Sequence, residues 1–349
     1  MRVDELRERV ESRFFRTAMA LPERLQRRLA GRPVVRQGQQ LATETQLMLR
    51  LLALAPDPPV ESVPIPQGRR ILRRQAVMGG GSQPIGEVRE LTVGGAEGDL
   101  PARLYTPRAL IGQQSAPLLV FFHGGGWIYG DLDSHDAPCR VLAEGAGVRV
   151  LSVDYRLAPE APFPAAYDDC VAAFDWTMRH AAELGADPER LAVGGDSAGG
   201  ALAAAVAIEA ARQGWPLRFQ LLVYPATDME GRSASRADFG EGFYLTSGFM
   251  DGAADAYIPD RSQRLDPRAS VLEAEIPADL APAYVVTAGF DPLRDEGEAY
   301  AARLAEAGVP VEVQRFADQI HGFFNLVGVG RRSRALVDQM AARLRVALS

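Results

Sequence analysis

Cysteine is scarce in this 349-residue sequence, with only Cys139 and Cys170 present. Two cysteines provide no disulfide framework and no cysteine metal site, and we interpret both as small buried apolar residues. No apolar run approaches the length of a transmembrane helix, so we expect no stable membrane insertion. The formal net charge is −7, which argues against nucleic acid as the main partner.

The first residues also lack the apolar segment of a secretory signal, because charged side chains dominate from Arg2 to Arg7. We therefore expect a cytoplasmic location. Apolar residues make up 47% of the chain, which is ample for the core of one large α/β domain with an accessory piece, or of two domains.

From Glu87 onward, short apolar runs alternate with helical patterns. Two alternating segments at 88–93 and 102–105 predict an antiparallel pair. The predicted strands that follow are Leu118–Phe122, Val148–Val153, Leu191–Val193, Phe219–Tyr224, Ala283–Ala288 and Val311–Phe316, and the predicted helices are Asp168–Leu184, Ala198–Gln213, Asp295–Ala307 and Arg331–Leu348. This order predicts an α/β protein with an eight-stranded, mostly parallel sheet flanked by helices.

Two segments fall outside this alternation. Residues 1–60 carry apolar side chains at helical spacing, and residues 227–267 are too long for a structureless loop. We interpret both as parts of one helical cap. A basic membrane-surface helix is the alternative for the first segment. The predicted division is 1–60 and 227–267 for the cap, and 61–226 and 268–349 for the core.

Ser197 stands in Gly-Asp-Ser-Ala-Gly, between the predicted strand at 191–193 and an alanine-rich helix. A serine in Gly-x-Ser-x-Gly at such a junction is a nucleophile elbow, in which small neighbours allow the sharp turn that exposes the hydroxyl. A glycine-rich helix start with an N-terminal serine is the plainer alternative.

A second motif, His123-Gly124-Gly125-Gly126-Trp127, follows the strand Leu118–Phe122 directly. Three glycines at the end of a strand let backbone N–H groups point into a crevice, as in loops that stabilise an oxyanion. No Lys-Ser or Lys-Thr follows, which excludes a Walker loop, and Rossmann glycine spacing is absent. We expect His123 to hold this loop.

A nucleophilic serine needs a histidine base, oriented by a carboxylate. Among four histidines, His321 follows the last predicted strand, where open α/β sheets bind ligands. Asp291 follows the strand before it, which completes the chain order Ser197, Asp291, His321. Asp295 and Asp318 are the rival carboxylates. An N-cap is the plainer interpretation of Asp291.

With these motifs in place, the chain resembles the bacterial hormone-sensitive-lipase family of α/β-hydrolase esterases. The resemblance also covers Asp154–Glu160, Asp291–Gly297 and His321–Phe323. It implies a triad of Ser197, Asp291 and His321. It further implies oxyanion donors in the N–H groups of Gly125, Gly126 and Ala198, and hydrolysis of short- to medium-chain acyl esters.

Two departures from the family pattern bear on the substrate. Asp318 and Gln319 stand where the family usually has Gly-Met, so an added carboxylate could raise the pKa of His321 or narrow the entrance. Met250 is followed by small residues, which predicts a roomy pocket beside Ala253.

We expect a serine carboxylesterase with a small-molecule ester as its partner, with neither cofactor nor metal, and we consider a homodimer as its assembly. The alternatives are an amidase, a longer-chain lipase, or a non-catalytic small-molecule receptor on the same fold.

Overall fold

An eight-stranded sheet forms the centre of the computed structural model, which describes residues 13–54, 57–231 and 233–349. The strand order is β10-β9-β8-β7-β5-β6-β4-β3. The strands are β3 (Glu87–Gly94), β4 (Asp99–Thr106), β5 (Ala116–Phe122), β6 (Arg149–Val153), β7 (Ala186–Asp196), β8 (Phe219–Val223), β9 (Ala283–Phe290) and β10 (Val311–Ile320). In this sheet, β4 pairs antiparallel with β3 and with β6, and every other pairing is parallel. The predicted mostly parallel sheet is therefore confirmed.

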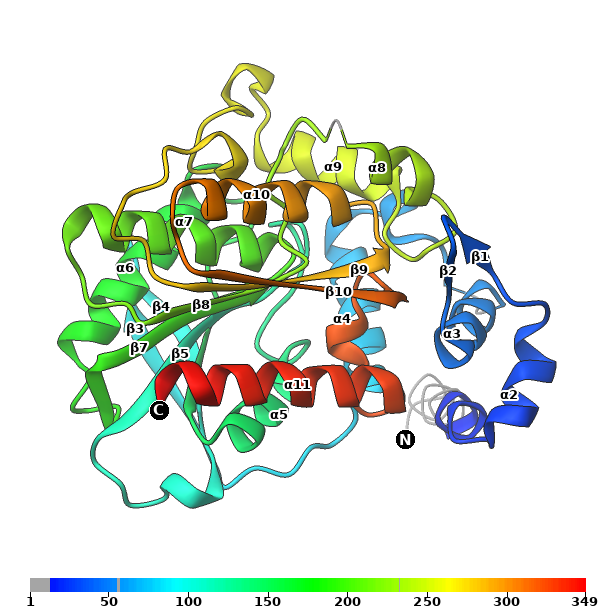
Figure 1. Ribbon diagram of the computed structural model, residues 1–349, viewed down its shortest axis with the longest axis horizontal. Coiled ribbons are helices and arrows are strands. Elements are labelled where there is room, and N and C mark those ends of the chain that lie inside the picture. The colour runs from blue at the N-terminus through cyan, green and yellow to red at the C-terminus, as the bar shows by residue number, and fades with distance from the viewer. Residues whose placement is uncertain (1–12, 55–56, 232) are drawn as a thin grey trace.

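Helices cover both faces of the sheet (Figure 1). One face carries α6 (Ala165–Arg179), α7 (Ala198–Gln213) and α10 (Arg294–Glu306), and the other carries α5 (Asp136–Ala146) and α11 (Arg331–Leu348). Because both faces are covered, every residue of β6, β8 and β9 is buried, which explains why these strands are mostly apolar.

Two helices of the structure were not predicted. They are α5 and α4 (Ile65–Gly80). In α4, Gly68 and Gly80 lie where the side chains of Tyr129 and Ala137 approach the helix closely, and these glycines obscure the helical pattern. In α5, Pro138 lies in the first turn, a position that a helix tolerates.

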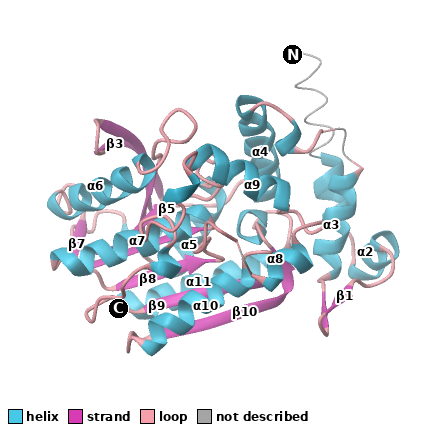
Figure 2. Cartoon of the chain, turned by 90° about the horizontal axis from the view of Figure 1, so that it is seen from above, coloured by secondary structure: helices cyan, strands magenta, loops and turns pink. Residues whose placement is uncertain are grey.

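The remaining elements gather over the carboxyl ends of the strands (Figure 2). Residues 13–19 are helical. They are followed by α2 (Glu23–Ala30), the small hairpin of β1 (Val35–Arg36) and β2 (Gln39–Gln40), and α3 (Thr43–Ala53). The insertion after β8 contributes α8 (Ala234–Phe239) and α9 (Ser247–Tyr257). The first apolar positions of the predicted N-terminal helix, up to residue 12, lie outside the described residues.

The N-terminal segment packs against the ends of the last two strands. Phe15 and Met48 share a buried cluster with Phe290, at the end of β9, and Ile320, at the end of β10. The Ala42 N–H donates to the carbonyl of Asp318 at 3.0 Å. None of the helices in the described parts of the chain is long and apolar enough to cross a lipid bilayer.

Candidate active site

Ser197 lies between the end of β7 and the first residue of α7, as the elbow pattern predicts. Its φ of 56° is unusual for a residue other than glycine. The flanking glycines permit the turn, because a Cβ on Gly195 would lie 2.3 Å from the Gly199 carbonyl oxygen. A Cβ on Gly199 would lie 2.0 Å from the Phe122 carbonyl oxygen. Any side chain at either position would therefore force strand and helix apart.

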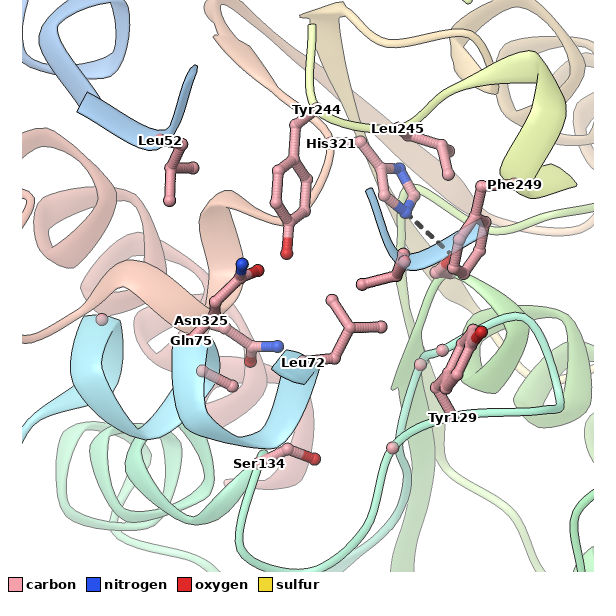
Figure 3. A pocket seen from close by; sticks show the side chains of 18 of the residues that line it. Leu52, Leu72, Gln75, Tyr129, Ser134, Tyr244, Leu245, Phe249, His321 and Asn325 are labelled. Atoms are coloured by element: carbon pink, nitrogen blue, oxygen red, sulfur yellow. Dashed lines mark hydrogen bonds between the residues drawn. The ribbon is translucent and has the colours of Figure 1, made fainter. Parts of the chain in front are cut away.

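The structure brings Ser197, His321 and Asp291 together. His321 Nε2 lies 2.9 Å from Ser197 Oγ (dashed in Figure 3). His321 Nδ1 lies 2.8 Å from Asp291 Oδ2. The other carboxylate oxygen of Asp291 accepts the Leu293 N–H at 2.8 Å, so this residue supports the local turn and the imidazole at once. The arrangement is that of a serine nucleophile, a base and an orienting acid.

The rival carboxylates point elsewhere. Asp295 accepts the Ser235 N–H and pairs with Arg294. Asp318 pairs with Arg332 at 2.8 Å and does not line the cavity described below. Neither carboxylate bonds to His321, so the predicted influence of Asp318 on the base and on the entrance finds no support in this geometry.

The loop after β5 carries the candidate oxyanion donors. Gly125 and Gly126 have φ values of 127° and 62°, and both line the cavity together with Ser197. Among the described residues, their N–H groups find no acceptor. Ala198 is the first residue of α7, so its N–H has no intrahelical acceptor, although Ala198 itself does not line the cavity.

Asp196 connects this loop to the elbow, a role that no local pattern in the sequence indicates. It is buried, and its Oδ1 accepts the Gly124 N–H at 2.9 Å and lies 3.1 Å from His135 Nε2. Burial by itself raises the pKa of Asp196, but His135 and the Gly124 N–H outweigh it and hold this pKa below its ordinary value. His135 is therefore a buried partner of Asp196.

His123 and His180 stay apart from the serine. The His123 ring stacks on Tyr155 with centroids 4.4 Å apart, and the Tyr155 hydroxyl donates to the His123 carbonyl. His180 stacks on Trp176. His123 thus holds the glycine loop, as expected.

Known proteins are similar to this chain over most of its length. The family described as alpha/beta hydrolase fold matches residues 119–325. The carboxylic ester hydrolase LipN of Mycobacterium tuberculosis is 44% identical over 328 residues, which are 92% of this chain and 86% of that protein. The chain belongs to the hormone-sensitive-lipase family of α/β-hydrolases. The predicted family and fold are therefore confirmed.

Two further relatives of this α/β-hydrolase come from archaea. An arylesterase of Saccharolobus solfataricus is 39% identical over 263 residues, which cover 75% of this chain and 84% of that protein. The structure of a hyperthermophilic esterase from Pyrobaculum calidifontis superposes with a TM-score of 0.84 at 36% identity, covering 88% of this chain and 99% of the other.

A cavity of about 600 Å³ opens beside the serine of this hydrolase. Its roof comes from the N-terminal segment and α4, and its sides come from the insertion. Figure 3 shows the side chains that surround it, which include Leu52, Leu72, Gln75, Tyr129, Ser134, Tyr244, Leu245, Phe249 and Asn325. The cavity is thus mostly apolar near the serine, with polar groups on α4 and beyond β10.

The prediction for Ala253 is wrong. Ala253 is 3% exposed and does not line the cavity. It lies behind the glycine loop, where a Cβ added to Gly126 would be 3.0 Å from the Cβ of Ala253. Phe249, one turn earlier on α9, fills the space instead and stacks on Tyr129 with centroids 5.5 Å apart.

Proposed function

We propose that this chain is a serine carboxylesterase that hydrolyses short- to medium-chain acyl esters through an acyl-enzyme intermediate. The observation that carries the proposal is the unbroken series of hydrogen bonds from Ser197 through His321 to Asp291, beside a cavity of about 600 Å³. The names of the relatives, a carboxylic ester hydrolase and an arylesterase, support the same chemistry.

The first half of the reaction acylates the serine. His321 Nε2 accepts the proton of Ser197 Oγ as this oxygen bonds to the ester carbonyl carbon, and Asp291 stabilises the imidazolium. The carbonyl oxygen, which becomes negative, accepts hydrogen bonds from the N–H groups of Gly125, Gly126 and Ala198, each of which raises the rate by roughly 10²–10³. The C–O bond to the alcohol then breaks, and His321 returns the proton to the departing oxygen.

The second half releases the acid. A water molecule gives a proton to His321 and bonds to the acyl carbon, the bond to Ser197 Oγ breaks, and the serine recovers its proton. Both halves use one base, so the distance of 2.9 Å between His321 Nε2 and Ser197 Oγ serves acylation and deacylation alike.

The cap sets how much of an ester fits. We propose residues 1–60 and 227–267 as its two parts, with α4 adding Leu72 to the same wall. The apolar lining near the serine and the volume of about 600 Å³ favour acyl chains of modest length over long fatty chains. The cytoplasmic location and the homodimer stay predictions.

The deciding experiment is a p-nitrophenyl ester series from acetate to palmitate, run beside matched anilides. We expect hydrolysis of the short and medium esters by the native protein and none by Ser197→Ala. A preference for anilides would make the protein an amidase, and a maximum at palmitate would make it a lipase. Tight ligand binding with no turnover of any ester would make it a receptor.

A further inference from the structure

One stretch of this acidic protein, residues 13–36, is strongly basic, although residues 1–12 carry four acidic side chains and three arginines. Residues 13–36 contain seven arginines and only one acidic residue, Glu23, although the whole chain has a net charge of −7. All seven arginine side chains are exposed. They are Arg13, Arg16, Arg24, Arg27, Arg28, Arg32 and Arg36. The charge of the molecule is therefore unevenly distributed, with a positive region at one end.

The same segment exposes large apolar side chains. Leu25 and Leu29 on α2 are 42% and 48% exposed, and Phe14 is 66% exposed. Only Gln26 and Ala30 of α2 are buried. Figures 1 and 2 show α2 at the outer end of the molecule, with α3 between it and the rest of the chain.

Helical geometry arranges these side chains in two adjoining stripes. Leu25 and Leu29 are four residues apart and lie on one side of α2, and Arg24 and Arg28 lie on the neighbouring side. Gln26 fixes the helix in this orientation, because its amide donates to the Met19 carbonyl at 2.6 Å. An exposed apolar stripe beside an arginine stripe is typical of helices that lie in the interface of an anionic membrane.

The inner face of this segment belongs to the cavity. Phe15 lines it next to the exposed Phe14, and Met48 and Leu52 line it from α3, on which α2 packs. A membrane surface that bound α2 would therefore lie close to the roof of the cavity.

We propose that α2 and its neighbouring arginines bind the surface of an anionic phospholipid membrane, with Leu25 and Leu29 reaching into the headgroup layer. Arginines near such a surface gain electrostatic attraction, and shallow burial of the leucines adds to it. A second copy of the chain fits this surface poorly, because a twofold contact of α2 with α2 would bring the two arginine stripes together. The membrane would then supply amphiphilic esters to the cavity, a consequence that rests on the proposed function.

The test is co-sedimentation of the full chain with vesicles of phosphatidylcholine alone, or mixed with an equal share of phosphatidylglycerol. We expect binding to the mixed vesicles alone, and weaker binding at high salt. Arg24→Gln with Arg28→Gln should lower the partition coefficient about thirtyfold, and Leu25→Ala with Leu29→Ala roughly tenfold. The control Arg212→Gln with Arg218→Gln removes the same charge from exposed positions outside this segment and should bind like the native protein.

Three results would overturn the proposal. These are absence of binding to the mixed vesicles, equal loss in the control and in the α2 variants, and self-association that disappears in the leucine variant. Nucleic acid added as a competitor provides one more test. If nucleic acid bound to the chain and the leucine variant still bound the vesicles as well as the native protein, the basic region would be a nucleic-acid site and the proposal would fail. Hydrolysis of soluble p-nitrophenyl acetate, measured in parallel, should be equal in all variants. If no variant and not even the native protein hydrolysed it, the proposed esterase function would be wrong, whereas the result on membrane binding would still stand.

Discussion

The carboxylate of Asp196 accepts the backbone N–H of Gly124 at 2.9 Å. Asp196 directly precedes the proposed nucleophile, and Gly124 directly precedes the proposed oxyanion donors. A Cβ on Gly124 would lie 2.6 Å from Asp196 Oδ2, so the two chain segments are in close contact. One buried hydrogen bond thus fixes the serine and the glycine loop relative to each other.

Removing this bond should impair catalysis more than binding. We expect Asp196→Ala to lower kcat by about 10²-fold, the order of one lost oxyanion donor, with a smaller change in KM. Asp196→Asn keeps an acceptor for the Gly124 N–H and should retain more activity. The measurement is steady-state hydrolysis of p-nitrophenyl butyrate. A native kcat in the alanine variant would show that the loop needs no such support.

The proposed triad should act as a unit. Ser197→Ala and His321→Ala should each lose at least about 10³ in kcat, and the double variant should be scarcely worse than either. Asp291→Asn should lose most of the activity. Asp295→Asn, whose carboxylate bonds to Ser235 and Arg294 instead, is the matched control. Additive losses in the double variant would contradict the mechanism.

Phe249 should limit the length of the acyl chain. Phe249→Ala opens the wall of the cavity next to Tyr129, so kcat/KM for longer esters should rise relative to acetate, by up to about 0.8 kcal/mol per added methylene. Ala253→Phe should instead lower kcat for every ester, because Ala253 lies against Gly126. If both variants kept the native chain-length profile, α9 would have no part in selectivity.

Glu296 should make stability depend on pH. It is fully buried, and burial raises its pKa to about 8, although it accepts the Thr227 N–H at 2.8 Å. The folded chain thus holds a proton that the unfolded chain releases near pH 4.5. This stabilisation is complete below that pH and is lost as the pH rises towards about 8.

Glu296→Gln removes this titration and keeps an oxygen for the Thr227 N–H. Each pKa unit is worth about 1.4 kcal/mol, so the unfolding free energy of the native protein should fall by at least that much relative to the variant between pH 5 and about 8. Urea unfolding at several pH values measures the difference. A constant difference would mean that Glu296 ionises normally.

The sequence was most informative where chemistry depends on short patterns at strand ends. Ser197, Asp291 and His321 each stand a few residues after a predicted strand, so their meeting at one edge of a parallel sheet could be predicted. The central strands β5, β8 and β9 could be predicted because burial on both faces leaves largely apolar runs, and β3 and β4 because their apolar residues alternate with polar ones.

Contacts between distant segments could not be predicted in this way. The bond between His135 and Asp196 leaves no local pattern, and the glycines of α4 reflect contacts with Tyr129 and Ala137 that exist only in the fold. The wrong prediction that Ala253 lines the pocket, where Phe249 does so instead, has a similar cause. The packing of α9 on the glycine loop sets the direction in which the helix presents each side chain.

The contact of the N-terminal segment with the ends of β9 and β10 also sets an order of events during synthesis. Phe15, Met48 and the Ala42 N–H leave the ribosome well before their partners at Phe290, Asp318 and Ile320. The first helices must therefore wait, with their apolar sides uncovered, until nearly the whole sheet has been made. The roof of the cavity and His321 both depend on the ends of β9 and β10, so an unfinished chain lacks both a covered cavity and a complete proposed triad.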